Sequence, residues 1–464
     1  MPDNVKVTDM DTEKKKSSGN DMTSGSPALL IIRFLIPLLI GNTFQQLYNM
    51  ADTVIVGHFV GENALAAVGS TGTVMFLVMG ICLGLTNGFA VLTSQRYGAK
   101  DKEGTRKSVA NGMLLAAIII VCMTVLSLLC TNGLLMLMNT PEAMFEDART
   151  YISIIFAGIV CTVFYNLFSA FLRAAGNSLV PLYFLIFSAI LNVALDLLFI
   201  VVFGFGVAGA AIATDISQGI SAILCWLYIR IKVPELHPLK GEWKLSGFIT
   251  RKQLHIGLPM ALQFGITASG TLMMQSAVNL FGETAVAGFT AANKYHMLLS
   301  QGMLSMGQTM TSYAGQNYGV ADIGRVRRGI RASLVIMFFF SLVVGAAAAF
   351  GYPYVLPLFF DADANVAAML PFAGTYILRC AVCYYPLSLI FIFRNSMQAC
   401  NYAFIPTCCG VMEFFARGAA ALLSMKLENY SLAASCDAVA WVAAGLFGLI
   451  AWLFVREDLK KKFV

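Results

Sequence analysis

The sequence carries little charge for its length. Only 12% of its 464 residues are Asp, Glu, Lys or Arg, whereas 58% are hydrophobic and the mean hydropathy is +0.74. A soluble globular domain carries about 25% charged residues, so the composition excludes one. The polar–apolar alternation of membrane β-barrel strands is also missing. The chain is therefore expected to be an all-α polytopic membrane protein.

Several functional motifs are absent from the sequence as well. Without G-x-x-x-x-G-K-[ST] no ATP-driven motor is expected in this chain, and without a TVGYG-like filter no potassium-type pore. H-E-x-x-H and G-x-S-x-G are missing, and nothing else suggests an enzyme. The eleven cysteines mostly fall in apolar segments without metal-ligand spacing, so we expect small apolar fillers. Neither a cofactor, a structural metal nor a nucleic-acid partner is predicted.

Long apolar runs account for most of the chain. With about 20 apolar residues needed for one crossing, we expect twelve transmembrane helices. They cover residues 28–51, 64–94, 107–131, 150–171, 179–202, 207–231, 254–281, 285–312, 328–352, 370–397, 404–425 and 433–455. Residues 353–369 are expected to form an extramembrane loop. The polar start is not a signal peptide, because no short apolar segment with a cleavage site follows it.

Basic residues collect on one side of the predicted spans. They lie in the N-terminal tail, in the loops after the second, sixth and eighth spans, and at the C-terminus. The opposite loops hold only Arg149 and Lys426, together with several acids. Because cytoplasmic loops are enriched in Lys and Arg, we expect a plasma-membrane protein with both termini in the cytoplasm.

The two halves of the chain repeat each other. GENALAAVG at 61–69 returns as GETAVAGFT at 282–290, and QRYG at 95–98 returns as QNYG at 316–319. Two six-helix bundles related by a pseudo-two-fold axis along the membrane normal are therefore expected, with the substrate site between them and alternating access by rocking. The predicted organisation is a disordered cytoplasmic tail (1–27), an N-terminal bundle with a cation site (28–231), a cytoplasmic linker (232–252), a C-terminal bundle (253–455) and a basic cytoplasmic tail (456–464).

The first half contains polar residues inside its apolar spans. Asn192 and Asp196 are four residues apart and so share one helix face; Asp52 and Thr214 lie in other spans. A carboxylate at the bilayer centre costs at least ~2.5–3.5 kcal/mol, and it marks an ion or substrate pathway unless it only pins helices. Two carboxylates in one cavity can hold a proton, and with the Asn192 and Thr214 oxygens they can also ligate Na⁺. Asp215 points about 100° away from Thr214 on a helix and is the weaker candidate.

Other polar and flexible positions allow two interpretations each. Pro37 removes a hydrogen bond from the first span; its kink is either static or controlled by the charge of Asp52. In the second half, Glu413 and Arg417 are four residues apart and are expected to neutralise each other, with a substrate contact as the alternative. Methionines that include Met273 and Met297 are either core filler or the wall of a cavity for varied hydrophobic ligands. We assign no role to Lys294 or His296.

Four stretches together resemble one transporter family. They are LYNMADTVIVGHFVGENALAAVG at 47–69, SQRYGAKD at 94–101, FLRAAGNSLVP at 171–181 and LNVALDLLFI at 191–200. With Pro37 and the two repeated halves, they resemble the multidrug and toxic compound extrusion (MATE) transporters over about residues 28–455, and among them the prokaryotic branch of the DNA-damage-inducible F type.

The resemblance implies a site and an activity. Members of that branch have a cation site in the first half whose positions match Asp52, Asn192, Asp196 and Thr214. Nearby polar positions match Tyr48, Tyr151 and Asn166. The sister branch has a second-half site that uses acids on spans seven and ten. In this chain, span seven has Gln263 and Gln275 instead, and span ten has no acid, so a second-half site is not expected.

The expected function is secondary active multidrug efflux. The resemblance implies a monomeric antiporter in the lipid bilayer that exports lipophilic, often cationic drugs in exchange for H⁺ or Na⁺. A lipid-linked precursor flippase of the same superfamily is the alternative. Such a flippase should line its cavity with several Arg or Lys, and the predicted spans contain few.

Overall fold

The computed structural model describes residues 21–137, 140–359 and 365–463, and these residues contain helices and no strand. The first half contains α1 (Pro27–Phe59), α2 (Glu62–Gly98), α3 (Lys102–Leu137), α4 (Glu142–Ala157), α5 (Ile159–Ala174), α6 (Leu179–Asp196) with the π-helical turn η1 (Leu197–Val202), and α7 (Gly206–Lys232). Two short 3₁₀ turns, η2 (Pro234–Leu236) and η3 (Lys240–Glu242), lead to the second half. That half contains α8 (Gly247–Asn279), α9 (Glu283–Leu299), α10 (Gln301–Gly319), α11 (Ile323–Val355) with the 3₁₀ turn η4 (Leu356–Phe359), α12 (Val366–Ala399), α13 (Phe404–Leu427), α14 (Tyr430–Ala433) and α15 (Cys436–Phe463).

Helices occupy all twelve predicted spans. Ten helices of the described chain are long and apolar enough to cross a membrane, and α4 with α5 form an eleventh span bent by 47°. The bend lies at Gly158, where an added Cβ would fall 1.9 Å from the Asp215 carboxyl carbon. The span predicted at 285–312 corresponds to α9 and α10, which Ser300 separates. Both interrupted spans were predicted as single helices; the first breaks at a glycine and the second at a serine.

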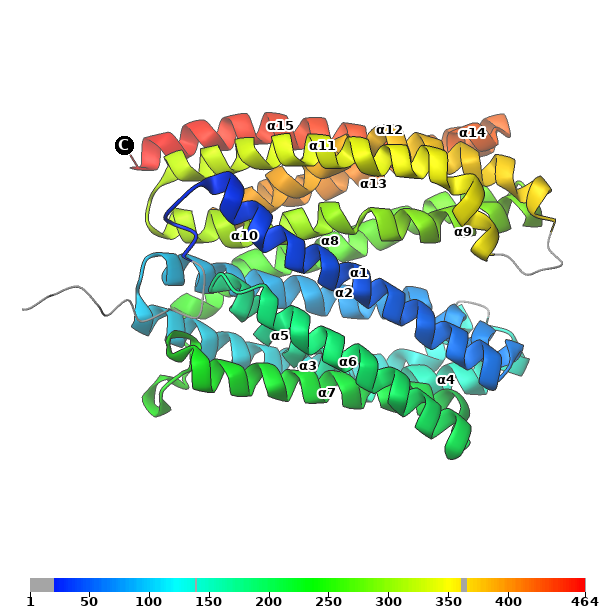
Figure 1. The fold of residues 1–464 in the computed structure, drawn as a ribbon, viewed down its shortest axis with the longest axis horizontal. Helices are drawn as coiled ribbons and strands as arrows, with labels where there is room; N and C mark the ends of the chain where they lie inside the picture. The colour runs from blue at the N-terminus through cyan, green and yellow to red at the C-terminus, as the bar shows by residue number, and fades with distance from the viewer. Residues whose placement is uncertain (1–20, 138–139, 360–364, 464) are drawn as a thin grey trace, which may run out of the picture.

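The helices form two lobes (Figure 1). We call α1–α7 the first lobe and α8–α15 the second lobe. Each has its own apolar core: Phe156 and Phe171 are fully buried in the first, and Tyr313 and Phe393 in the second. Two bundles related by a pseudo-two-fold axis along the membrane normal, as predicted from the repeat, are thus confirmed.

Helix α1 connects the two lobes. Its first turns place Ile31 and Phe34 in the core of the second lobe, whereas Val56, near its end, packs among first-lobe residues. In Figure 1 this dark blue helix runs obliquely across the molecule. Pro37 is buried inside the continuous helix, between the two contacts.

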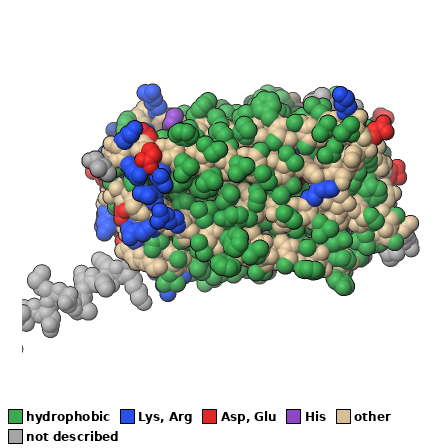
Figure 2. All heavy atoms as spheres, turned by 90° about the horizontal axis from the view of Figure 1, so that it is seen from above, with side chains coloured by type: hydrophobic (Ala, Val, Ile, Leu, Met, Phe, Trp, Pro, Cys, Tyr) green, Lys and Arg blue, Asp and Glu red, His purple; other side chains and the backbone are tan. Residues whose placement is uncertain are grey.

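The outer surface is apolar around the middle and basic at one end (Figure 2). Large apolar side chains such as Leu129 and Val382 are about four-fifths exposed, as expected where lipid rather than water surrounds the protein. Lys and Arg gather at the end where α1 starts and α15 finishes. We call this the basic end.

Hydrogen bonds join the lobes symmetrically at the basic end. The Gln95 side chain donates to the carbonyl of Ala399 over 2.8 Å, and the Gln316 side chain donates to the carbonyl of Ala174 over 2.8 Å. Gln95 and Gln316 are equivalent positions of QRYG and QNYG, and Ala174 and Ala399 are equivalent in the later repeat. The same hydrogen bond therefore forms twice, once from the first lobe to the second and once from the second lobe to the first.

The glycines of the same motifs allow this contact. A Cβ on Gly98 would lie 2.1 Å from the Gln316 carbonyl oxygen, and one on Gly319 would lie 1.9 Å from the Gln95 carbonyl oxygen. Backbones approach this closely only where no side chain intervenes. We call these two hydrogen bonds and two glycine contacts the basic-end clamp.

The N-terminal tail prediction is wrong for its last residues. Residues 1–20 lie outside the described chain, but Met22 is buried in the second lobe. Its backbone nitrogen donates to Gln316 over 3.0 Å, and its carbonyl accepts from Asn317 and Arg325. These side chains satisfy the backbone that water would otherwise solvate, which orders the segment.

The predicted loops are also shorter than expected. α11 continues to Val355 and α12 starts at Val366, so part of 353–369 is helical; residues 360–364 lie outside the described chain. α8 starts at Gly247, inside the predicted linker, because Asn111 on α3 holds this segment: it accepts from the Ser246 nitrogen and donates to Thr250. The predicted C-terminal tail continues α15 as helix to Phe463.

Candidate functional site

Two carboxyl groups meet inside the first lobe. Asp52 comes from the second half of α1 and Asp196 from the last turn of α6, and both are buried. Their carboxyl groups lie within hydrogen-bonding reach of each other, and the Oδ1 atom of each has no hydrogen-bond partner among the described residues. Two carboxylates in such contact repel strongly unless a proton or a cation lies between them.

Asn192 and Thr214 complete this group. In the orientation that matches its neighbours, the Asn192 amide donates to Asp196 Oδ2 over 2.9 Å and accepts from the Thr214 nitrogen over 3.2 Å. The i,i+4 spacing read from the sequence therefore produces a direct contact on one face of α6. We call Asp52, Asn192, Asp196 and Thr214 the acid cluster.

The helix changes geometry directly after Asp196. The six residues of η1 have π-helical hydrogen bonding, although the sequence predicts a regular helix over 179–202. π-turns recur at functional sites because they re-aim the side chains next to them. The apolar sequence LLFIVV contains no signal that could have indicated this change.

Two tyrosines adjoin the acid cluster, and two other polar candidates do not. Tyr48 is buried within hydrogen-bonding reach of Thr214, and Tyr151 is buried close enough to Asp52 to feel its charge. Asn166 donates to the carbonyl of Thr162 on its own helix, and no hydrogen bond among the described residues joins it to the cluster. Asp215 points toward the Gly158 bend.

Pro37 is distant from the acid cluster along the helix. Fifteen residues separate it from Asp52, which corresponds to about 22 Å at 1.5 Å per residue. Any effect of Asp52 on the proline region must therefore pass along α1.

The second lobe contains a buried ion network. Arg417 Nη2 lies 2.7 Å from Glu413 Oε1, so the predicted pair forms, and Arg417 Nε lies 2.9 Å from Asp437 Oδ1. The Tyr376 hydroxyl donates to the other Asp437 oxygen over 2.8 Å. The network joins α12, α13 and α15, and breaking one buried partner costs about 3–5 kcal/mol. Asp437 was missed, although it is an acid inside a predicted span.

The two predicted methionine contacts are not among the residues that line the two hollows described below. Met273 packs against Gly418 on α13, and Met297 is 43% exposed on the outside of α9. Met303, Met306 and Met310 are fully buried and act as core filler. His296, for which no role was assigned, is buried and stacks against the rings of Tyr384 and Trp441, which also stack against each other.

A cavity of about 150 Å³ lies between the lobes. Residues of α2 and α5 line it from the first lobe, and residues of α8, α10 and α12 line it from the second. Its lining contains Arg173 and Arg394, and no Asp or Glu. We call it the interlobe cavity. The position between the bundles agrees with the expected place of the substrate site.

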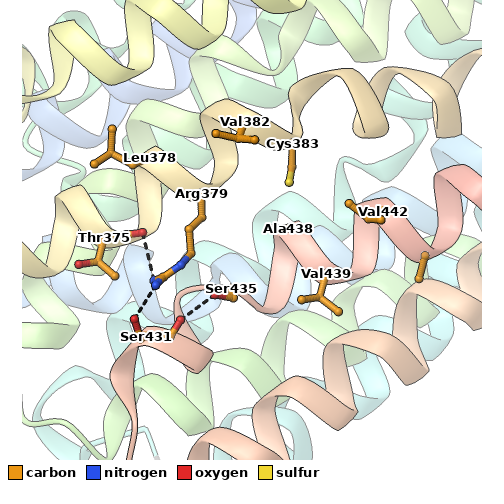
Figure 3. A pocket seen from close by; sticks show the side chains of 11 residues that line it. Thr375, Leu378, Arg379, Val382, Cys383, Ser431, Ser435, Ala438, Val439 and Val442 are labelled. Atoms are coloured by element: carbon orange, nitrogen blue, oxygen red, sulfur yellow. Dashed lines mark hydrogen bonds between the residues drawn. The ribbon is translucent and has the colours of Figure 1, made fainter.

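A second hollow opens on the outer surface of the second lobe (Figure 3). It lies between α12 and the α14–α15 segment and is lined mainly by apolar side chains such as Leu378 and Val439. Figure 3 shows Arg379 reaching across it to the Ser431 hydroxyl. Because this hollow lies on the outer surface, a substitution of Arg379 can serve as a control for substitutions of the arginines in the interlobe cavity.

The fold and site define a class of protein. Two repeated helical bundles, buried polar groups inside them and a cavity between the two are the architecture of a multi-pass membrane transporter. A family model described as MatE matches residues 37–198 and 259–417, one stretch in each lobe. The chain belongs to the MATE family, as its motifs predicted, and is a transporter rather than an enzyme.

Relatives and solved structures agree with this assignment. The chain is 34% identical over 309 residues to the probable multidrug resistance protein YpnP of Bacillus subtilis, which covers 66% of this chain and 68% of the relative. It is 25% identical over 349 residues to the DNA damage-inducible protein F of Escherichia coli, covering 69% of this chain and 71% of the relative. A crystal structure of MATE in the straight conformation matches at a TM-score of 0.87 with 25% identity, covering 96% of this chain and 100% of that one.

A further structure shows likeness in fold alone. It is a MOP superfamily transporter from Pyrococcus furiosus, described as having a binding pocket of reverse polarity, and it matches at a TM-score of 0.91 with 24% identity over 96% of this chain and 100% of that one.

Proposed function

We propose that this protein is a secondary active multidrug exporter driven by H⁺ or Na⁺ entry. The observation that supports this best is the contact between Asp52 and Asp196 in the sealed first lobe. Relatives named as multidrug resistance proteins, from Bacillus subtilis and Thermotoga maritima, support the drug-efflux part. A lipid-linked precursor flippase is not favoured, because none of these names describes one.

The acid cluster is suited to carry the coupling ion. Its carboxylates, the Asn192 amide oxygen and the Thr214 hydroxyl are oxygen ligands, which hard cations prefer. One proton shared by the two carboxyl groups removes the same repulsion. Both ions therefore fit, and each would convert a repelling pair into an attractive contact between α1 and α6.

The position of α1 offers a route from ion binding to lobe movement. Asp52 lies in the part of α1 that packs on the first lobe, whereas Phe34 packs on the second. Occupancy of the acid cluster would stabilise the first contact and bias α1 between straight and bent forms at Pro37. This change in the shape of α1 would in turn make one lobe rock against the other.

We place the basic end in the cytoplasm, following the rule that Lys and Arg face inward. Both termini are then cytoplasmic, and the basic-end clamp closes the cytoplasmic side in the conformation described. The protein is proposed to work as a monomer in the plasma membrane, with small drugs as substrates. Organic cations are one class, because the acid cluster attracts positive charge.

Efflux from cells tests the proposal. Cells that express the wild type should lose a preloaded fluorescent drug such as ethidium, whereas Asp52→Asn and Asp196→Asn should each retain it at the level of cells without the protein. Asp215→Asn is the matched control and should export normally, since Asp215 lies outside the cluster. Normal export by either cluster variant, at equal membrane expression, would refute the assigned role.

A further inference from the structure

The charge lining the interlobe cavity is positive. Arg173 on α5 and Arg394 on α12 approach it from opposite lobes, and the other polar lining groups are amides and hydroxyls. No Asp or Glu of the described residues lines it. The acid cluster lies elsewhere, inside the first lobe, so the two sites have opposite polarity.

Neither arginine has a carboxylate partner. No ion pair of the described residues includes Arg173 or Arg394. Arg173 donates to the amide oxygen of Asn87 over 3.2 Å, and the Arg394 guanidinium lies 5.0 Å above the Phe391 ring. The nearby acid Glu413 is already paired with Arg417. Both arginines are half-buried, and no carboxylate neutralises either guanidinium, so both retain N–H donors for an anion.

Besides the two arginines, one buried amide group can donate a hydrogen bond into the cavity. Gln263 is only 7% exposed, and its Oε1 accepts a hydrogen bond from Gln398 over 3.3 Å. Its Nε2 has no partner in the described chain. A buried donor without an acceptor costs about 1–3 kcal/mol, and a ligand oxygen in the cavity would remove this cost.

We infer that the interlobe cavity binds the acidic group of an amphiphilic substrate, a carboxylate or a phosphate. Planar guanidinium groups match these oxygens and form two parallel hydrogen bonds with them. Apolar lining residues, among them Leu83, Met260 and Phe264, would contact the rest of the molecule. The inference rests on the proposed function for taking this cavity as the substrate site, and it adds acids and zwitterions to the substrates expected.

The cavity lies beside the basic-end clamp. Ala174, whose carbonyl accepts from Gln316 in the clamp, also lines the cavity, as does Ser94, the neighbour of Gln95. Opening of the clamp would therefore admit a substrate from that end directly to the arginines.

A matched pair of dyes tests the inference by binding alone. Fluorescence anisotropy with purified protein in detergent would compare a rhodamine that has a free carboxyl group with the methyl ester of the same dye. The wild type should bind the acid at least about tenfold more tightly, the equivalent of one charge-assisted hydrogen bond. Arg173→Gln and Arg394→Gln should each lose this preference, whereas Arg379→Gln, in the outer hollow of Figure 3, should keep it.

Competition then identifies the acidic group. An alkyl carboxylate and an alkyl phosphate of equal chain length would displace the acid dye, and the stronger competitor gives the preferred group. Equal binding of dye and ester by the wild type, no displacement by either competitor, or the same loss in Arg379→Gln with unchanged thermal stability would overturn the inference. Because binding needs no ion gradient, this result is independent of whether the protein exchanges drugs for H⁺ or Na⁺.

Discussion

Burial makes the acid cluster a site whose state depends on an added ion. Asn192 and Asp196 are fully buried and Asp52 is 8% exposed, so water cannot screen the contact between the two carboxyl groups. Asn192 is a neutral group that bridges Asp196 and the Thr214 backbone. At the residue scale, Asn192 therefore holds the acids in position rather than carrying the charge.

Replacement of Asn192 should weaken ion binding without unfolding the protein. Asn192→Ala removes the hydrogen bond that orients Asp196, and a hydrogen bond to a charged group contributes about 1.5–3 kcal/mol. We expect the ion gradient needed for half-maximal transport to rise at least about tenfold. Asn166→Ala is the control and should transport normally, because among the described residues the Asn166 side chain hydrogen-bonds within α5 and not to the cluster. An equal defect in both variants would contradict this assignment.

The linker contains an acid whose titration affects stability. Burial acts to raise the pKa of Glu242, but hydrogen bonds from Arg106 and from the Leu239 nitrogen outweigh it and lower the pKa below its ordinary value of 4.5. A lowered folded-state pKa means that this contact is present above pH 4.5 and is lost as the pH falls through the lower folded value.

Thermal unfolding in detergent measures this effect. The wild type should lose stability relative to Glu242→Gln as the pH falls below about 4.5, and the two melting temperatures should converge at the lowest pH. At pH 7 the variant should be slightly less stable, by about 1 kcal/mol or less, as for partly exposed ion pairs. A constant difference between the two proteins at every pH would show that the Glu242 charge does not contribute.

Sequence reasoning predicted contacts within one helix and missed those between helices. Asn192 with Asp196 and Glu413 with Arg417 were found because a spacing of four residues implies contact. Asp437 lies 20 residues from Arg417, and Arg173 and Arg394 come from different lobes, so no spacing indicates that they share a site. The side-chain direction of Asn166 also depends on tertiary packing, and its place near the acid cluster stays a prediction from family resemblance.

At the element scale, the basic-end clamp is the contact most suited to control access. α2 and α10 end there in equivalent motifs, and each supplies one glutamine and one glycine. The repeat was visible in the sequence as QRYG and QNYG, but its reciprocal pairing was not. The helix interruptions at Gly158, Ser300 and Leu197 were also missed, because a single glycine or serine inside a long apolar run does not by itself predict a break.

Weakening the clamp should open the basic end. Gln95→Ala with Gln316→Ala removes both interlobe hydrogen bonds, so the open form should become more populated. Cys400, which follows the Ala399 acceptor and is buried, is a native reporter. Its labelling by a water-soluble maleimide should become several-fold faster, as measured by mass spectrometry.

Two comparisons control this measurement. Gln275→Ala removes an exposed hydrogen bond within α8 and should leave the labelling rate unchanged. Cys436, buried at the start of α15, should remain protected in every variant. Unchanged labelling of Cys400 in the double variant would show that the clamp does not keep this end closed.

At the scale of the whole molecule, duplication of six helices explains the two similar lobes, and the differences between the lobes explain why only the first is expected to bind an ion. Both lobes keep the same helix order, which the sequence repeat predicted. The first lobe keeps the acid cluster, whereas the position equivalent to Asp196 is Ala421 and that equivalent to Asn192 is Arg417. One lobe therefore contains groups that can take up an ion, and the other neutralises its acids with an arginine.

This asymmetry leads to one decisive measurement. Purified wild type and Asp196→Asn would be reconstituted into proteoliposomes, and drug uptake would be followed under a proton gradient and, separately, under a Na⁺ gradient. We expect the wild type to transport under one of the two gradients and Asp196→Asn under neither, which would establish ion-coupled export through the acid cluster. Transport by Asp196→Asn at the wild-type rate, or no gradient-driven transport by well-folded wild type, would contradict the account.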